Sequence, residues 1–109
     1  MIKKDTKVAV LGAGAMGCLF GGLLAEKGLD VVLIDVWKEH VNEINNKGLK
    51  MMGHGGDRII KIKATTEPKT LKPVDAIIIM CKATALEQAL TNSKNITGDN
   101  TLLMSFQNG

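Results

Sequence analysis

The sequence has few aromatic residues, and that shortage already excludes one class of partner. Phe20, Trp37 and Phe106 are the only aromatic side chains, 3% of the chain. Proteins that bind single-stranded nucleic acids combine a basic stripe with stacking aromatic residues, and this sequence has neither. We therefore expect no nucleic-acid partner, and we assign the formal net charge of +3 to a solvated surface.

Long apolar runs and cysteine clusters are lacking too. The longest apolar run, residues 76–81, is far too short to cross a membrane, and no apolar segment follows the charged start as in a signal peptide. We expect a cytoplasmic protein without a membrane partner. Cys18 and Cys81 are too few for a disulfide framework, and each lies among apolar residues as a small buried side chain would. They and the two histidines lack the spacing of metal ligands, so we expect no metal site, with His40 on a helix surface and His54 in a loop.

What the sequence does contain is a series of short apolar runs that alternate with amphipathic segments. With 109 residues, 45% of them hydrophobic, a single globular domain is expected. The predicted strands cover residues 7–11, 31–34, 76–81 and 101–106, and the predicted helices cover residues 14–27, 37–47 and 84–93. The alternation predicts an α/β domain of the Rossmann type, with a doubly wound, mainly parallel sheet and helices on both faces.

Two parts of this outline carry more detailed expectations. The first helix is expected to turn one apolar face to the core, formed by Met16, Leu19, Phe20, Leu23 and Leu24. The glycine-rich stretch over residues 49–66 predicts two short strands or a hairpin-like excursion. Residues 67–73 are expected to form a loop and residues 95–100 a turn.

A glycine-rich turn joins the first strand to the first helix. Its sequence is Gly12-Ala13-Gly14-Ala15-Met16-Gly17. In a dinucleotide-binding turn of this pattern, Gly12 allows the sharp bend, Gly14 lets a pyrophosphate approach the backbone, and Gly17 lets the helix pack closely on the first strand. The amide groups and the dipole of the helix N-terminus then favour the phosphates. The alternative is a plain tight turn without a ligand.

Two charged residues near the end of the second strand bear on the choice of cofactor. Asp35 is expected to accept hydrogen bonds from the adenosine ribose hydroxyls, and its charge would repel a 2′-phosphate, which favours NAD over NADP. Lys38 lies three residues further on and is a candidate partner for such a phosphate. The preference between the two dinucleotides is left open by the sequence, as is the alternative that Asp35 is a surface residue.

Two more candidates follow the later strands. Lys82 comes directly after the strand at residues 76–81, at the edge of the sheet where ligands of open α/β sheets bind, so it is expected to reach phosphate, ribose or substrate. A solvated lysine is the alternative. Asn108 follows the last strand, where its amide is placed to bind a carbonyl or hydroxyl group near the nicotinamide. An Asn-Gly turn explains Asn108 equally well.

The chain resembles the N-terminal domain of the ketopantoate reductases (2-dehydropantoate 2-reductases) over essentially its whole length. The resemblance rests on residues 8–17, on the Gly48-Leu49 step, on residues 75–83 and on Ser105-Phe106-Gln107-Asn108-Gly109. It implies the reduction of a 2-keto acid, 2-dehydropantoate, with NADPH on the route to pantothenate. It also implies that Lys82 and Asn108 act in catalysis beside cofactor and substrate, and that residues 12–17 hold the pyrophosphate.

The chain departs from that family in two respects. Many members that use NADPH have an arginine after the second strand, where this chain has Asp35-Val36-Trp37-Lys38. The family's helical C-terminal domain, with its acid–base lysine, is expected to lie outside residues 1–109, which would form the NAD(P)-binding domain alone. An apolar patch left by that domain would favour a homodimer. The alternatives are the cofactor domain of a dehydrogenase of the 3-hydroxyacid or 6-phosphogluconate type, or a stand-alone nucleotide-sensing module.

Overall fold

Short strands and helices alternate along the part of the chain that the structure describes. The computed structural model describes residues 5–51, 53, 56–81 and 83–105, with the backbone alone for residues 83, 85 and 86. The strands are β1 (Lys7–Leu11), β2 (Asp30–Ile34), β3 (Leu49–Met51), β4 (Arg58–Ile60), β5 (Lys63–Thr65), β6 (Val74–Ile79) and β7 (Thr97–Ser105). The helices are α1 (Ala15–Glu26), α2 (Lys38–Lys47) and α3 (Ala83–Asn92), with 3₁₀ turns η1 (Pro68–Thr70) and η2 (Lys94–Ile96).

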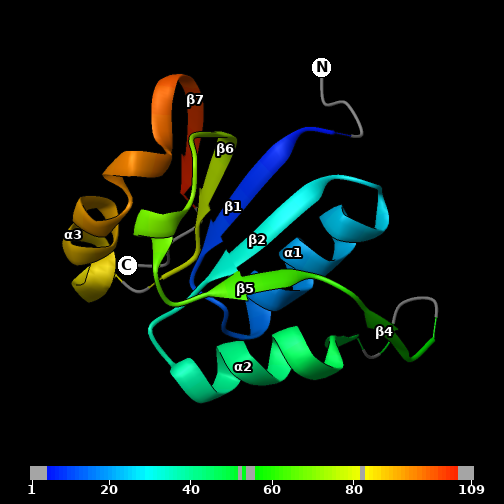
Figure 1. The fold of residues 1–109 in the computed structure, drawn as a ribbon. Helices are drawn as coiled ribbons and strands as arrows, with labels where there is room; N and C mark the ends of the chain where they lie inside the picture. Colours follow the sequence, from blue (N-terminus) through cyan, green and yellow to red (C-terminus); the bar gives the residue numbers. More distant parts are fainter. Residues whose placement is uncertain (1–4, 52, 54–55, 82, 106–109) are drawn as a thin grey trace.

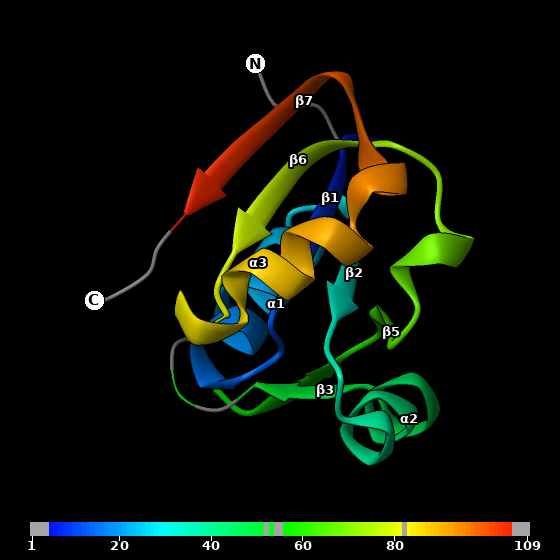
Figure 2. The same ribbon diagram turned by 90° about the vertical axis from the view of Figure 1, so that its left-hand side faces the viewer.

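Five strands form a parallel sheet in the order β5-β2-β1-β6-β7. The helices α1 and α2 cover one face, and α3 covers the other (Figure 1, Figure 2). The strand order reverses direction at β1, so β1, β2 and β6 end side by side at the edge where open α/β sheets bind their ligands. The predicted doubly wound, Rossmann-type α/β fold is confirmed.

The central strand β1 is buried on both faces, as a parallel strand between two helical layers must be. Val8 and Val10 pack in the cluster shared with α1 and α2, whereas Ala9 and Leu11 pack in the cluster on the α3 side. Val8 is in register with Val31 of β2 and with Ala76 of β6. This double burial explains why the strand is a continuous apolar run with no alternation.

The helix α1 packs on the sheet mainly through glycines, so the predicted apolar face is only partly confirmed: Leu19 and Leu24 pack against the core, but Met16 and Leu23 do not. Met16 is 54% exposed and Leu23 lies at the surface, whereas Gly17, Gly21 and Gly22 are the buried residues of the helix. A Cβ on Gly21 would lie 2.6 Å from Leu33 Cδ2. Because no side chain stands between them, helix and sheet approach closely, and larger residues such as Leu19 pack only at the flank.

The excursion over residues 49–66 contains the predicted hairpin and also an edge strand of the main sheet. Strands β3 and β4 pair antiparallel, while β5 joins the sheet beside β2. The side chain of Asn45 on α2 fastens β5 through its amide: Nδ2 donates to Ala64 O (2.8 Å) and Oδ1 accepts from Ala64 N (2.9 Å). Arg58 of β4 pairs with Glu26 of α1, and this hydrogen bond lowers the pKa of Glu26.

One of two segment boundaries differs from the prediction. Strand β7 already begins at Thr97, so the turn expected over residues 95–100 is mostly strand, with an irregular step in its pairing to β6. The helix α2 ends where expected, because Gly48 adopts φ +85°, which side chains disfavour. None of the helices in the described part of the chain is long and apolar enough to span a membrane.

Candidate dinucleotide site

The glycine-rich turn bends sharply at Gly12, between β1 and α1. Gly12 has φ +105°, a conformation that side chains rarely adopt, and its N–H donates to Ile34 O at 2.7 Å. A Cβ there would lie 2.9 Å from the backbone nitrogen of Cys81, so the turn also touches the end of β6. The bend therefore needs a glycine for its backbone angle and for the close approach of another segment.

Gly14 and Gly17 stand in opposite surroundings. A Cβ on Gly17 would lie 1.9 Å from Gly12 O, so the first turn of α1 lies against the bend at a distance that only a glycine allows. A Cβ on Gly14 would meet no atom within 4 Å, and Gly14, Ala15 and Met16 are exposed. No side chain caps the N-terminus of α1, and no acidic residue lies in its first turn. The helix thus presents an open N-terminus with room above the backbone, which suits an anion.

The carboxylate of Asp35 lies against this turn and braces it. Asp35 Oδ2 accepts the N–H of Ala13 at 2.8 Å, while Oδ1 accepts the N–H of Val36 at 2.6 Å and is 3.4 Å from that of Trp37. The sequence predicts that Asp35 lies near the turn, but not that the turn is tied to its side chain. The neighbouring Val36 and Trp37 are 90% and 61% exposed, so they stand at the mouth of the site.

His40 is a contact of the turn that the sequence does not predict. It is half-buried rather than on the outer surface of α2, and its Nε2 lies 2.8 Å from Ala13 O, as a donor would. The ring of Trp37 lies beside it, with ring centroids 5.5 Å apart. The spacing of residues on α2 could have indicated that His40 faces inward, because His40 precedes the buried Ile44 by one helical turn and lies on the same face.

The two cysteines lie close to the turn but are held as thiols. Cys18 Sγ is 3.2 Å from Ala13 O, and burial, followed by the charge of Asp35, raises its pKa. Burial likewise raises the pKa of Cys81, although Cys81 is only half-buried. Neither has the lowered pKa of a nucleophilic cysteine.

A narrow cavity opens beside Asp35 on the α3 face of the sheet, and we call it the base slot. Its volume is about 190 Å³. It runs from the ends of β1 and β2 to the end of α3 and to η1. It is lined by Leu11, Gly12, Ile34, Asp35, Val36, Thr66, Pro68, Cys81, Gln88, Ala89, Asn92 and Ser93. Most of these contribute apolar surface, and no lysine or arginine is among the described residues that line the slot.

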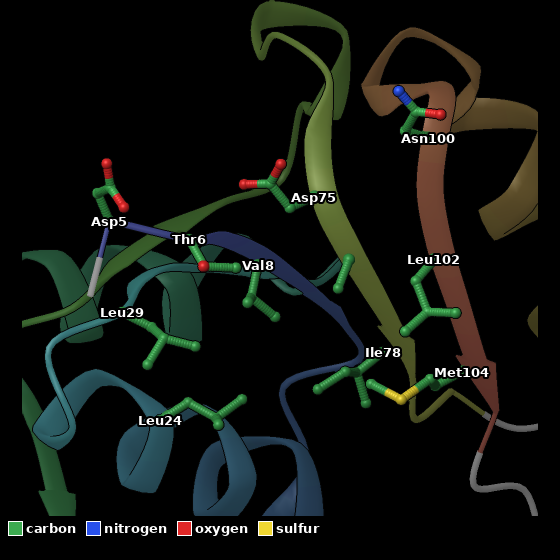
Figure 3. Close-up of a pocket in the computed structure, with 11 residues that line it drawn as sticks. Asp5, Thr6, Val8, Leu24, Leu29, Asp75, Ile78, Asn100, Leu102 and Met104 are labelled. Carbon is green, nitrogen blue, oxygen red and sulfur yellow. The ribbon is translucent and has the colours of Figure 1, made fainter. Parts of the chain in front are cut away.

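A larger hollow, of about 700 Å³, lies over the other face of β1, β6 and β7, toward their amino ends (Figure 3). Leu24, Ile78, Leu102 and Met104 line it, and Figure 3 shows that they come from α1, β6 and β7. It holds none of the residues predicted to bind the cofactor. We interpret it as a part of the sheet face that no helix covers.

The remaining predicted site residues are only partly placed. Lys38 is exposed at the start of α2, four residues beyond the end of β2. Lys82, Asn108 and His54 lie outside the described residues. In the part of the chain that is described, no three histidine, cysteine or acidic side chains are grouped as metal ligands.

Comparison with known protein families relates the chain to one family. Residues 8–109 match the family model described as ketopantoate reductase PanE/ApbA. A 2-dehydropantoate 2-reductase from Pyrococcus abyssi is 45% identical over 103 residues, which are 94% of this chain and 33% of that protein. One from Streptococcus pyogenes is 34% identical over a similar share. The chain thus spans about a third of the length of these curated relatives.

Solved structures agree with this grouping. A D-mandelate dehydrogenase, solved with NADH and anilino(oxo)acetate, superposes with a TM-score of 0.89 at 36% identity, over 95% of this chain and 34% of that one. A PanE/ApbA family ketopantoate reductase from Ralstonia eutropha superposes with a TM-score of 0.88 at 35% identity, over 95% and 35% of the two chains.

Proposed function

The chain belongs to the ketopantoate reductase family, and from that membership we propose that it forms the dinucleotide-binding part of a reductase of 2-keto acids. The observation that carries the proposal is the open turn at Gly14. Three glycines shape the turn, yet a Cβ on the middle one would meet no described atom within 4 Å, so internal packing does not require a glycine there. A pyrophosphate approaching the backbone is what the missing side chain would admit.

The residues around the turn fit a nicotinamide dinucleotide. The N–H groups at the open end of α1, from Ala15 to Gly17, would hold the pyrophosphate. Asp35 would accept the ribose hydroxyls next to the adenine, and the adenine ring itself would lie in the base slot between Val36 and Ala89. The slot is too small for the whole dinucleotide but has the scale of one flat base.

We further propose that the protein prefers NADH. In the proposed site, Asp35 would put a negative charge where NADPH carries its 2′-phosphate, and among the described residues that line the base slot no cation offsets it. The NADH in the related D-mandelate dehydrogenase supports the same choice. Lys38 is the argument for NADPH, because this exposed cation follows Asp35 by three residues and is a candidate partner for the 2′-phosphate.

When bound, the nicotinamide would supply the hydride, and the protein would orient it toward a 2-keto carbonyl. We propose that Lys82 and Asn108, which follow β6 and β7, bind the nicotinamide ribose and the substrate. 2-Dehydropantoate is the substrate that the curated relatives favour. A second candidate substrate is another 2-keto acid. The chain matches the D-mandelate dehydrogenase as well, in sequence identity and in superposition, as it matches the ketopantoate reductase from Ralstonia eutropha.

We propose that residues 1–109 act as one domain and that further substrate-binding groups come from outside it. The basis is length, since the relatives named as reductases are about three times as long. A homodimer and a cytoplasmic location stay predictions.

Calorimetric titration with NADH and NADPH tests the proposal. We expect NADH to bind at least about tenfold more tightly, and Asp35→Asn to narrow that ratio because it removes the charge and keeps the shape. Glu43→Gln makes the same charge change on the exposed side of α2 and should leave the ratio unchanged. Tighter binding of NADPH would overturn the NADH preference alone, and binding of neither would overturn the proposed function.

A further inference from the structure

An exposed tryptophan stands at the start of α2, where neither the helix nor the core accounts for it. Trp37 is the N-cap residue of α2, a position that favours serine, threonine, aspartate or asparagine, and its side chain caps no N–H group. The residue is also 61% exposed, so little of its ring contributes to the core. Large aromatic side chains at the surface are enriched at binding sites, so contact with a ligand would explain this one.

A closed series of contacts nevertheless holds Trp37 in place. Its N–H lies 3.4 Å from Asp35 Oδ1, and its carbonyl accepts the N–H of Val41 at 3.1 Å. Its ring lies beside that of His40, with an angle of 31° between the two planes. His40 Nε2 in turn lies 2.8 Å from Ala13 O, and the N–H of Ala13 donates to Asp35 Oδ2. The indole is therefore fixed against the glycine-rich turn without a ligand, although most of the residue is open to solvent.

Trp37 lines a second cavity beside Asp35, which we call the outer pocket. Its volume is about 290 Å³. Its walls include Gly14, Cys18 and His40, so it lies on the side of the sheet that α1 and α2 cover, opposite the base slot (Figure 1). Among the described residues, Asp35 alone lines both cavities. A ribose held by Asp35, with its base in the base slot, would thus present its other edge to the outer pocket.

We propose that Trp37 is a cofactor-binding residue whose indole packs against the adenosine ribose of the bound dinucleotide, from the side of the outer pocket. This inference rests on the proposed function. Among the described residues that line the pocket there is no lysine or arginine, and the one carboxylate is that of Asp35. Because an indole offers an apolar face and a single N–H donor, such walls suit an uncharged sugar better than a phosphate. The ribose would lie between a carboxylate that accepts its hydroxyl and an aromatic face that excludes water.

The fluorescence of Trp37 tests this inference directly, because it is the only tryptophan of the chain. ADP-ribose is the probe, since it carries the adenosine ribose but lacks the reduced nicotinamide that would absorb the emission. Saturating ADP-ribose should shift the emission of the wild type to shorter wavelength. It should also weaken quenching by acrylamide about twofold, because the ligand would cover one of the two ring faces. Emission and quenching that stay unchanged when calorimetry shows ADP-ribose bound would overturn the inference.

Three variants of the full chain add a second measurement. Trp37→Ala should lower the affinities for NADH and for ADP-ribose about tenfold and by the same factor, since the lost contact is at the adenosine end. Trp37→Phe keeps a flat ring and should bind both within about threefold of the wild type. Ile59→Ala removes an apolar side chain of β4 that is 67% exposed and lines neither cavity, so it should change neither affinity.

The outcomes separate this inference from the proposed function. An unchanged affinity of Trp37→Ala for ADP-ribose would overturn the inference, while binding by the wild type upheld the function. If thermal unfolding shows that Trp37→Ala does not fold, the fluorescence of the wild type still decides, because it needs no variant. If the wild type bound neither NADH nor ADP-ribose, both proposals would fail.

Discussion

Two glycines of the turn, Gly14 and Gly17, should respond to alanine in opposite ways. At Gly17 alanine gains helix propensity of about 1 kcal/mol, but its Cβ would stand 1.9 Å from Gly12 O. A backbone oxygen cannot rotate away as a side chain can, so the start of α1 must shift by about an ångström, and a clash this severe costs about 2–3 kcal/mol, the upper part of the range for overpacking. We expect a net loss of about 1–2 kcal/mol and a melting temperature about 5–10 °C lower.

At Gly14 the same substitution should leave the fold almost unchanged. Gly14 has φ −73° and ψ −169°, which alanine adopts freely, and the new Cβ would meet nothing. The poorer helix N-cap and the stiffer unfolded chain nearly cancel, so we expect a change within about 0.5 kcal/mol. The Cβ would, however, occupy the space proposed for the pyrophosphate, and NADH affinity should fall at least about tenfold.

Thermal unfolding with and without NADH, together with calorimetric titration, measures both effects. Gly98→Ala serves as the control for a tight but smaller clash far from the turn, since its Cβ would lie 3.3 Å from Pro73 Cβ, and it should leave NADH affinity unchanged. The reasoning is refuted if Gly14→Ala binds NADH like the wild type, because the open space would then have no ligand. It is equally refuted if Gly17→Ala is as stable as the wild type.

Three further predictions follow from the same region and from the uncovered sheet face. His40→Ala removes the contact to Ala13 O and should lower the free energy of unfolding in urea by about 1 kcal/mol, and an unchanged midpoint would contradict that role. The raised pKa values of Cys18 and Cys81 imply slow alkylation of both thiols by iodoacetamide at pH 7, and fast alkylation would contradict the raised values. They also imply that the free energy of unfolding falls as the pH rises above about 8.5, because the thiols of the unfolded chain ionise at lower pH than those of the folded chain. Leu102, which is 57% exposed at the hollow of Figure 3, should promote self-association, so Leu102→Gln should shift sedimentation toward monomer, and a wild type that is monomeric at high concentration would exclude it.

The strands and the turn were predictable because their signals are local. The cores of β1, β2 and β6 are unbroken apolar runs, and a parallel strand buried on both faces requires such runs. The bend at Gly12 and the close packing at Gly17 likewise follow from which residues lack a Cβ. These features depend on neighbours in the chain, so the sequence alone expresses them.

The features that were missed depend on distant partners. An apolar helix face is predicted from hydrophobic side chains. It could not indicate that α1 packs on the sheet through Gly21 and Gly22, because these two residues contribute by lacking a side chain. Strand β5 has three residues and begins with Lys63; its place beside β2 is secured by the side chain of Asn45 from α2.

In the proposed site, Asp35 would serve the fold and the ligand together. A carboxylate has about four acceptor sites, and the chain uses one on Oδ2 for Ala13 and two on Oδ1 for Val36 and, at the longer distance of 3.4 Å, Trp37. One acceptor site on Oδ2 therefore remains for a ribose hydroxyl, and the internal bonds hold the carboxylate in place without a ligand. The same bonds mean that an arginine at this position, though suited to a 2′-phosphate, would leave the N–H of Ala13 without its acceptor. On this proposal the choice of dinucleotide would be coupled to the stability of the turn, because the carboxylate proposed to select the ribose also braces the loop proposed to bind the pyrophosphate.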